Sequence, residues 1–322
     1  MLSYVLHEIG GQILPEQREI PQVSQDGALV KVAYAALNHR DCWIQKGQYA
    51  GLKFPIVLGS DLSGWLGDEE VLVNPGYYWG TDETVQSSQF QILGLPQDGA
   101  LSEYVVVPKS QVHTLPSHLS LQQAAALPLA GLTAYRALVQ RGGTRSGEKV
   151  LITGIGGGVA LFAFQFALAL GCQVVVSSSS QEKRQKALDM GASYAYDYTN
   201  DQWTKELMKD LGGVDVIIDG AGGESFSQLI KIAKPAGRIV IYGGTQGEIQ
   251  KMSPQQIFWK QLSVLGSTMG SEQDFEQMLA FVEKHKIVPV IDSVYPISEV
   301  NTAMDRMRES KQFGKLILRI EQ

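Results

Sequence analysis

A glycine-rich segment near the middle of the chain carries the clearest chemical signal. It reads Val150-Leu-Ile-Thr-Gly-Ile-Gly-Gly-Gly-Val-Ala, with an apolar strand before the glycines and an apolar helix after them. Glycines let the backbone approach a pyrophosphate, and the free N–H groups at the start of a helix donate to it. An ordinary glycine turn is the alternative, but the strands and helices that follow favour a dinucleotide site. The residues expected to bind the cofactor here are Gly154, Gly156, Gly157, Gly158 and Val159.

A run of serines after the next predicted strand indicates which dinucleotide binds. Sites for NAD place an acidic residue at the end of that strand, where it accepts from the ribose hydroxyls. Ser178, Ser179 and Ser180 stand there instead. Lys183 follows one turn into the next predicted helix. Because hydroxyls and an ammonium suit a 2′-phosphate and no acid repels it, we predict NADPH. The alternative is that the serines only begin the helix and that Lys183 is a solvated charge.

The elements around these motifs alternate between strands and helices from residue 121 onward. The predicted strands are 149–153, 173–177, 191–197, 214–219, 238–243 and 261–267, and the helices include 122–140, 181–190, 202–211 and 224–234. This alternation predicts a doubly wound parallel sheet. The first third carries short strands at 28–36, 71–73 and 101–108 instead, with a long loop at 74–99.

These patterns predict an α/β protein of two domains. We expect a β-rich catalytic domain at residues 1–120 and a Rossmann dinucleotide-binding domain at 121–285. The tail returns to short strands around one helix after Pro289, so we expect residues 286–322 to complete the catalytic domain.

Composition narrows the classes of partner. The chain has 322 residues and a formal net charge of −6, which argues against nucleic acid. Its longest apolar run, 159–176, is interrupted by polar residues, and its start lacks the pattern of a signal peptide, so we expect no membrane span. Two cysteines in a chain of this length favour a reducing compartment, and we expect a cytoplasmic protein.

Further short motifs occur in an order that resembles the medium-chain dehydrogenase/reductases, and within them the zinc-independent, quinone-oxidoreductase-like branch. The resemblance covers nearly the whole chain and rests on Asn38-His-Arg-Asp41, Pro55-Ile-Val-Leu-Gly-Ser-Asp61, Gly99-Ala-Leu-Ser-Glu-Tyr-Val, the segment 124–135, the glycine loop and Phe313-Gly-Lys-Leu. It implies a Rossmann domain inserted in a partly barrel-like catalytic domain.

This chain differs from the zinc-containing members of the family at the positions of their metal ligands. Where those members carry zinc ligands, this chain has Asn38, Ser60-Asp61 and Leu129. Asn, Ser and Leu are not useful ligands, and a catalytic zinc needs about three from the protein. The four-cysteine lobe is also missing, and the five histidines are scattered along the chain. We therefore predict no bound metal.

The resemblance also implies which residues surround the nicotinamide and the substrate. Asn38, Asp41 and Tyr49 are the expected catalytic residues. The cofactor is expected to contact further positions, namely Thr133, Tyr198, Gly243, Gly244, Ser267 and Met269. Four aromatic residues either wall an apolar substrate pocket or pack within the protein: Trp43, Tyr77, Tyr78 and Trp79.

The predicted function is NADPH-dependent, zinc-independent reduction of quinones or α,β-unsaturated carbonyl compounds. Two alternatives remain open, a zinc-free carbonyl or alcohol oxidoreductase and a non-catalytic NADPH-binding protein. The partners expected are a small-molecule substrate and a second copy of the chain. The edge strand near 261–267, preceded by Phe258-Trp259, is the expected dimer contact.

Overall fold

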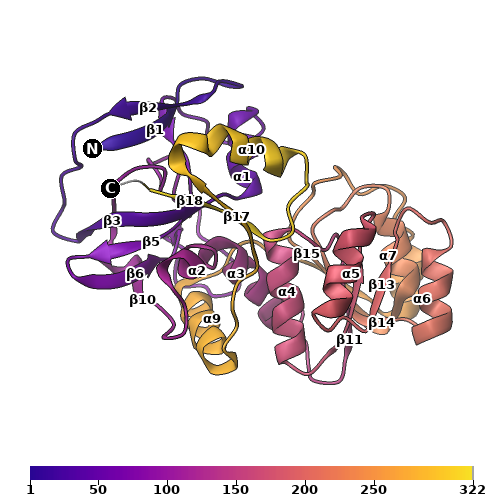
Figure 1. The fold of residues 1–322 in the computed structure, drawn as a ribbon. Coiled ribbons are helices and arrows are strands. Elements are labelled where there is room, and N and C mark those ends of the chain that lie inside the picture. Colours follow the sequence, from indigo (N-terminus) through magenta and orange to yellow (C-terminus); the bar gives the residue numbers. More distant parts are fainter. Residues whose placement is uncertain (321–322) are drawn as a thin grey trace. The chain divides into compact units, whose positions relative to one another are not determined.

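The computed structural model describes residues 1–320, and the chain divides into two compact units. Unit 1 comprises residues 1–132 and the segment from Met269 onward, and unit 2 is the continuous segment Thr133–Thr268. The predicted α/β class, with a parallel Rossmann-type sheet and a β-rich second part, is confirmed (Figure 1). Among residues 1–320, no helix has the length and apolar character needed to cross a membrane.

Unit 2 is built on a parallel sheet of six strands in the order β13-β12-β11-β14-β15-β16. Its central strands are buried on both faces, which is why they read as unbroken apolar runs such as Val174–Val176. The strands are β11 (Lys149–Ile152), β12 (Gln173–Ser177), β13 (Tyr194–Tyr196), β14 (Val214–Asp219), β15 (Ala233–Ile241) and β16 (Ser263–Gly266). The connecting helices are α4 (Gly158–Ala169), α5 (Gln181–Asp189), α6 (Trp203–Leu211), α7 (Phe226–Ile232) and α8 (Pro254–Lys260).

The helix predicted at 122–140 is interrupted. It forms α2 (Leu121–Ala125), α3 (Pro128–Tyr135) and a π-helical segment η2 (Arg136–Arg141). Pro128 lacks an N–H and cannot continue the hydrogen bonding of α2, so it begins a new helix.

Unit 1 centres on a seven-stranded sheet in the order β10-β6-β5-β3-β18-β17, with β9 also paired to β3. Its strands are β3 (Gly27–Ala36), β5 (Asp61–Leu66), β6 (Glu69–Val73), β9 (Tyr104–Pro108), β10 (Val112–Thr114), β17 (Ile291–Pro296) and β18 (Lys315–Arg319). A three-stranded sheet contains β1 (Leu2–Leu6), β2 (Ile13–Gln17) and β4 (Ile56–Val57). A two-stranded sheet contains β7 (Gly76–Tyr77) and β8 (Gln91–Ile92). The other helices are α1 (His39–Gln45), η1 (Lys109–Gln111), α9 (Glu272–His285), η3 (Ile297–Glu299) and α10 (Val300–Arg308).

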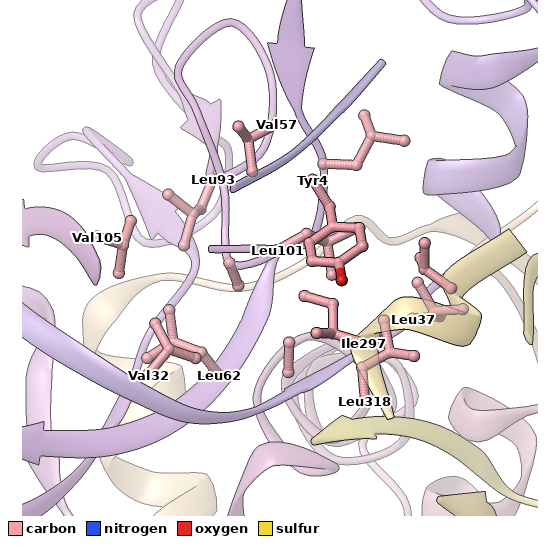
Figure 2. Packing of buried hydrophobic residues seen from close by; sticks show 14 of the residues in the cluster. Tyr4, Val32, Leu37, Val57, Leu62, Leu93, Leu101, Val105, Ile297 and Leu318 are labelled. Carbon is pink, nitrogen blue, oxygen red and sulfur yellow. The ribbon is translucent and has the colours of Figure 1, made fainter. Parts of the chain in front are cut away.

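The core of unit 1 joins segments that are distant in the sequence. Figure 2 shows Tyr4, Val32 and Leu62 in one apolar cluster with Ile297 and Leu318. The strand β18 lies antiparallel beside β3 and parallel to β17, so the returning tail is part of the central sheet.

The boundaries of the units differ from those expected at 120/121 and 285/286. The contacts place them at 132/133 and 268/269. The first difference arises because α2 packs against β3 and β5 of the central sheet. The second arises because α9, which the sequence patterns did not predict, packs in unit 1, with the ring of Phe275 4.9 Å from that of His113.

Candidate functional site

A buried polar cluster in unit 1 contains two of the three expected catalytic residues. Asn38 is the N-cap of α1, and its backbone N–H donates to Asp41 Oδ2 over 2.8 Å. The other oxygen of Asp41 accepts from the N–H of Gly59 at 3.2 Å. Burial raises the pKa of Asp41, while Arg40 and these two N–H groups act in the opposite direction. Both carboxylate oxygens of Asp41 thus hold the backbone of the site.

Lys315 lies at the centre of the same cluster. It belongs to the closing motif Phe313-Gly-Lys-Leu, but it is not among the expected site residues. Its Nζ donates to Asn38 Oδ1 at 2.7 Å, to Asp61 Oδ2 at 2.9 Å and to the carbonyl of Leu37 at 2.9 Å. Asp61 also accepts from Asn38 Nδ2 at 2.9 Å and from the N–H of Leu129 at 2.7 Å. The ammonium and the carboxylate are almost completely buried, at 3% and 0% exposure. Good geometry and full hydrogen bonding are what make such a buried pair tolerable.

Tyr49, the third expected catalytic residue, is linked to this cluster through Arg40. The guanidinium carbon of Arg40 lies 5.1 Å from the centre of the Tyr49 ring. Its Nη1 donates to Ser60 Oγ at 2.8 Å and to the carbonyl of Leu93 at 2.7 Å. The buried Arg40 therefore fixes the position of the Tyr49 ring by a cation–π contact.

The side chains at the three positions where zinc-containing members carry metal ligands do not fit a catalytic zinc. Asn38, Asp61 and Leu129 meet in one hydrogen-bond network, but only Asp61 carries a ligand-type group, and it already accepts three hydrogen bonds. The positive charge among them is the ammonium of Lys315. Within residues 1–320, no group of three His, Cys, Asp or Glu side chains is placed to hold a metal ion.

The aromatic residues considered for a substrate pocket separate into two groups. Tyr77 and Trp79 are buried. Tyr77 belongs to the apolar core of unit 1, and the Trp79 ring packs edge-on to Phe90 within the loop at 74–99. Trp43 is half-buried and Tyr78 is exposed.

The glycine loop of unit 2 has the conformation that its sequence requires. Gly154 and Gly156 have φ values of 61° and 128°, which side chains other than glycine rarely adopt. Gly157 is the N-cap of α4, and Gly158 and Val159 begin the first turn of this twelve-residue helix. A Cβ placed on Gly154 or Gly157 meets nothing within 4 Å. The loop therefore leaves open space in front of the helix start, which suits a pyrophosphate.

The serines after β12 have different surroundings. Ser178 is buried, and the Ser180 hydroxyl caps α5 by accepting from the N–H of Lys183 at 3.3 Å. Ser179 is exposed and accepts from the Tyr198 hydroxyl at 3.2 Å. Motif spacing could not predict this pair, since nineteen positions separate the two residues.

The Lys183 side chain extends toward the glycine loop. A Cβ placed on Gly156 would lie 3.2 Å from Lys183 Nζ. The neighbouring Arg184 is neutralised by Asp197 at 3.0 Å and donates to the carbonyl of Ser178.

The remaining cofactor candidates in unit 2 follow strand ends. Gly243 and Gly244 follow the end of β15 after one intervening residue, Tyr242. Ser267 comes directly after β16, and its N–H donates to the carbonyl of Ile241 at 2.9 Å. Carboxyl ends of parallel strands are where ligands bind in such sheets. Thr133 is a buried residue of α3 at the start of unit 2.

Met269 is buried and belongs to unit 1, at its boundary in the sequence. It has a φ of 38°.

Comparison with known proteins identifies the family. A model described as "Alcohol dehydrogenase GroES-like domain" matches residues 24–117, and one described as "Zinc-binding dehydrogenase" matches residues 158–284. The zinc-type alcohol dehydrogenase-like protein YogA of Leptosphaeria maculans is 35% identical, over 97% of this chain and 96% of its own. The chain belongs to the medium-chain dehydrogenase/reductase family. It is thus an oxidoreductase.

Two solved structures of this family show how closely the fold is shared. The first, described as an NAD-dependent alcohol dehydrogenase, has a TM-score of 0.94 and 33% identity, with 100% of both chains covered. The second is the quinone oxidoreductase from Thermus thermophilus, whose complex with NADPH is known. It has a TM-score of 0.84 and 27% identity, covering 99% of this chain and 100% of its own.

Proposed function

We propose that this family member is an NADPH-dependent, zinc-independent reductase of quinones or α,β-unsaturated carbonyl compounds. One observation carries the proposal. At the three positions where zinc-containing relatives carry metal ligands, the one carboxylate, Asp61, already accepts hydrogen bonds from Asn38, from the N–H of Leu129 and from the Lys315 ammonium.

The choice of substrate class follows from the charge that develops during reduction. A simple ketone becomes an alkoxide, which zinc stabilises as a Lewis acid. Quinones and conjugated alkenes spread the arriving charge over their own bonds. A site that offers only hydrogen-bond donors therefore suits these acceptors better than simple ketones.

The residues of unit 2 fit a dinucleotide with a 2′-phosphate. The open glycine loop at the start of α4 would hold the pyrophosphate. Ser179, Tyr198 and Lys183 would hold the 2′-phosphate, and the oxidoreductase from Thermus thermophilus supports this cofactor. When bound, the reduced nicotinamide supplies the hydride.

Two side chains of unit 1 would donate hydrogen bonds to the substrate oxygen. The Tyr49 hydroxyl is a donor whose ring is held by Arg40. The Asn38 amide uses one of its two hydrogens on Asp61, which leaves the second for a ligand. Asp41 contributes by holding the backbone of Asn38 and Gly59.

A zinc-free carbonyl or alcohol oxidoreductase is the second candidate. The similarity in fold to the NAD-dependent alcohol dehydrogenase favours it. In that case Tyr49 would act as the acid toward a simple carbonyl.

A substrate screen distinguishes the two candidates. NADPH absorbance is followed with quinones, enones, enals, ketones and aldehydes, and NADP⁺ reduction is followed with alcohols, each with and without chelator. We expect turnover of quinones or enones that persists in chelator, and no stoichiometric zinc by elemental analysis, because a catalytic zinc needs about three protein ligands. Stoichiometric zinc with chelator-sensitive activity would refute zinc independence. Faster oxidation of alcohols than reduction of any quinone or enone would establish the second candidate.

A further inference from the structure

The Asn38 side-chain amide has one orientation in which its contacts with Lys315 and Asp61 are both attractive. Its Oδ1 faces the ammonium of Lys315 at 2.7 Å, and its Nδ2 faces the carboxylate of Asp61 at 2.9 Å. Rotating the amide by half a turn would place Nδ2 against the ammonium and Oδ1 against the carboxylate. Two charge-assisted hydrogen bonds would then become two repulsive contacts.

The charged pair is itself fixed by its surroundings. Lys315 opens β18, and its third hydrogen bond goes to the carbonyl of Leu37, the residue before Asn38. Asp61 opens β5 and is held by the N–H of Leu129. Because both groups lie on strands of one sheet and are almost fully buried, neither can turn away to relieve a wrongly placed amide.

We infer that Lys315 is a positioning residue that sets the orientation of the Asn38 amide, so that its second N–H points a donor at the oxygen of the substrate. The inference rests on the proposed function for the part that concerns the substrate. Lys315 itself has its three hydrogens engaged by Leu37, Asn38 and Asp61, so it acts through Asn38 and not by contact with the ligand.

The test requires a variant that removes the positioning charges and still folds. Lys315→Met alone would leave the buried carboxylate of Asp61 without its counter-charge. The double variant Lys315→Met/Asp61→Asn, called the neutral pair below, removes both charges and keeps an oxygen that can accept from the N–H of Leu129. Lys260→Met is the matched control. The Lys260 ammonium also donates to three acceptors, the carbonyls of residues 230, 231 and 233, but it belongs to unit 2.

A double-mutant cycle gives the kinetic evidence. With the quinone or enone that the wild type reduces best, the neutral pair should lower kcat at least tenfold, and by no more than the roughly 100- to 1000-fold expected for loss of a whole donor. The dissociation constant of NADPH should stay the same. In the Asn38→Ala background the neutral pair should change kcat by less than about twofold, because the amide that Lys315 orients is no longer present. An equal loss in both backgrounds would overturn the inference, since Lys315 would then act independently of Asn38.

A second readout does not depend on turnover. The side-chain amide signals of Asn38, assigned in a ¹⁵N-labelled protein by their loss in Asn38→Ala, should shift in the neutral pair and stay in place in Lys260→Met. Unchanged signals in the neutral pair would refute the positioning role. If the wild type reduces no acceptor in the screen, the proposed function fails, and the amide signals still decide whether Lys315 orients Asn38.

Discussion

Replacing Lys183 by alanine tests the predicted preference for NADPH most directly. The side chain is half-buried and runs along the glycine loop, with Nζ 3.2 Å from the Cβ position of Gly156. An ammonium so placed is less screened by water than a solvated one. One hydrogen bond to a charged group contributes about 1.5–3 kcal/mol, which corresponds to about a 10- to 150-fold change in the dissociation constant. We expect Lys183→Ala to weaken NADPH by that factor and to leave NADH nearly unchanged.

The assay is a titration of both cofactors at one fixed salt concentration, followed by protein fluorescence or calorimetry. Lys186→Ala is the matched control, since Lys186 lies on the same helix but is exposed and paired with Glu182 at 2.7 Å. It should alter neither affinity. Equal losses of NADPH and NADH in Lys183→Ala would refute the reasoning, because Lys183 would then support the loop and not the 2′-phosphate.

Three further outcomes are expected. Tyr49→Phe should lower kcat about 100- to 1000-fold if its hydroxyl donates in the transition state, with NADPH binding unchanged, whereas Tyr78→Phe should be neutral. Light scattering at micromolar concentration should give a dimer joined through Ser263–Gly266, and Trp259→Asp, at a residue 79% exposed, should weaken it; a monomeric wild type would contradict this. Hydrogen bonds from a lysine and a serine lower the pKa of Glu283 from 4.5 to about 2, so its stabilisation is present above about pH 4.5 and lost as the pH falls toward 2. The Tm difference between wild type and Glu283→Gln should shrink over that range, and a constant difference would argue against this assignment.

The strands of unit 2 were predictable because buried strands consist mainly of apolar residues. Residues 173–177 and 214–219 were predicted with the bounds that β12 and β14 have, since parallel strands covered on both faces read as apolar runs. Helix α9 was missed because its polar residues outweigh the apolar stripe formed by Phe275, Met278 and Val282.

The centre of the candidate site was harder to predict, because its members come from distant parts of the chain. Asn38, Asp61 and Leu129 could be grouped from motif order, but Lys315 pairs with Asp61 across 254 positions. One signal was present in the sequence. A lysine that opens an otherwise apolar strand, Leu316-Ile-Leu, must either reach water or find a buried acid.

The place of β18 in the central sheet also sets the order in which the protein can assemble during synthesis. Unit 2 is continuous, so it can fold as soon as its last residues leave the ribosome. Unit 1 must wait, because β3 lacks its neighbour and Asp61 lacks its counter-charge until β18 has been made. The oldest part of the nascent chain is therefore the last to mature. A chain arrested before Lys315 keeps an unpaired sheet edge, the kind of exposed surface for which chaperones exist.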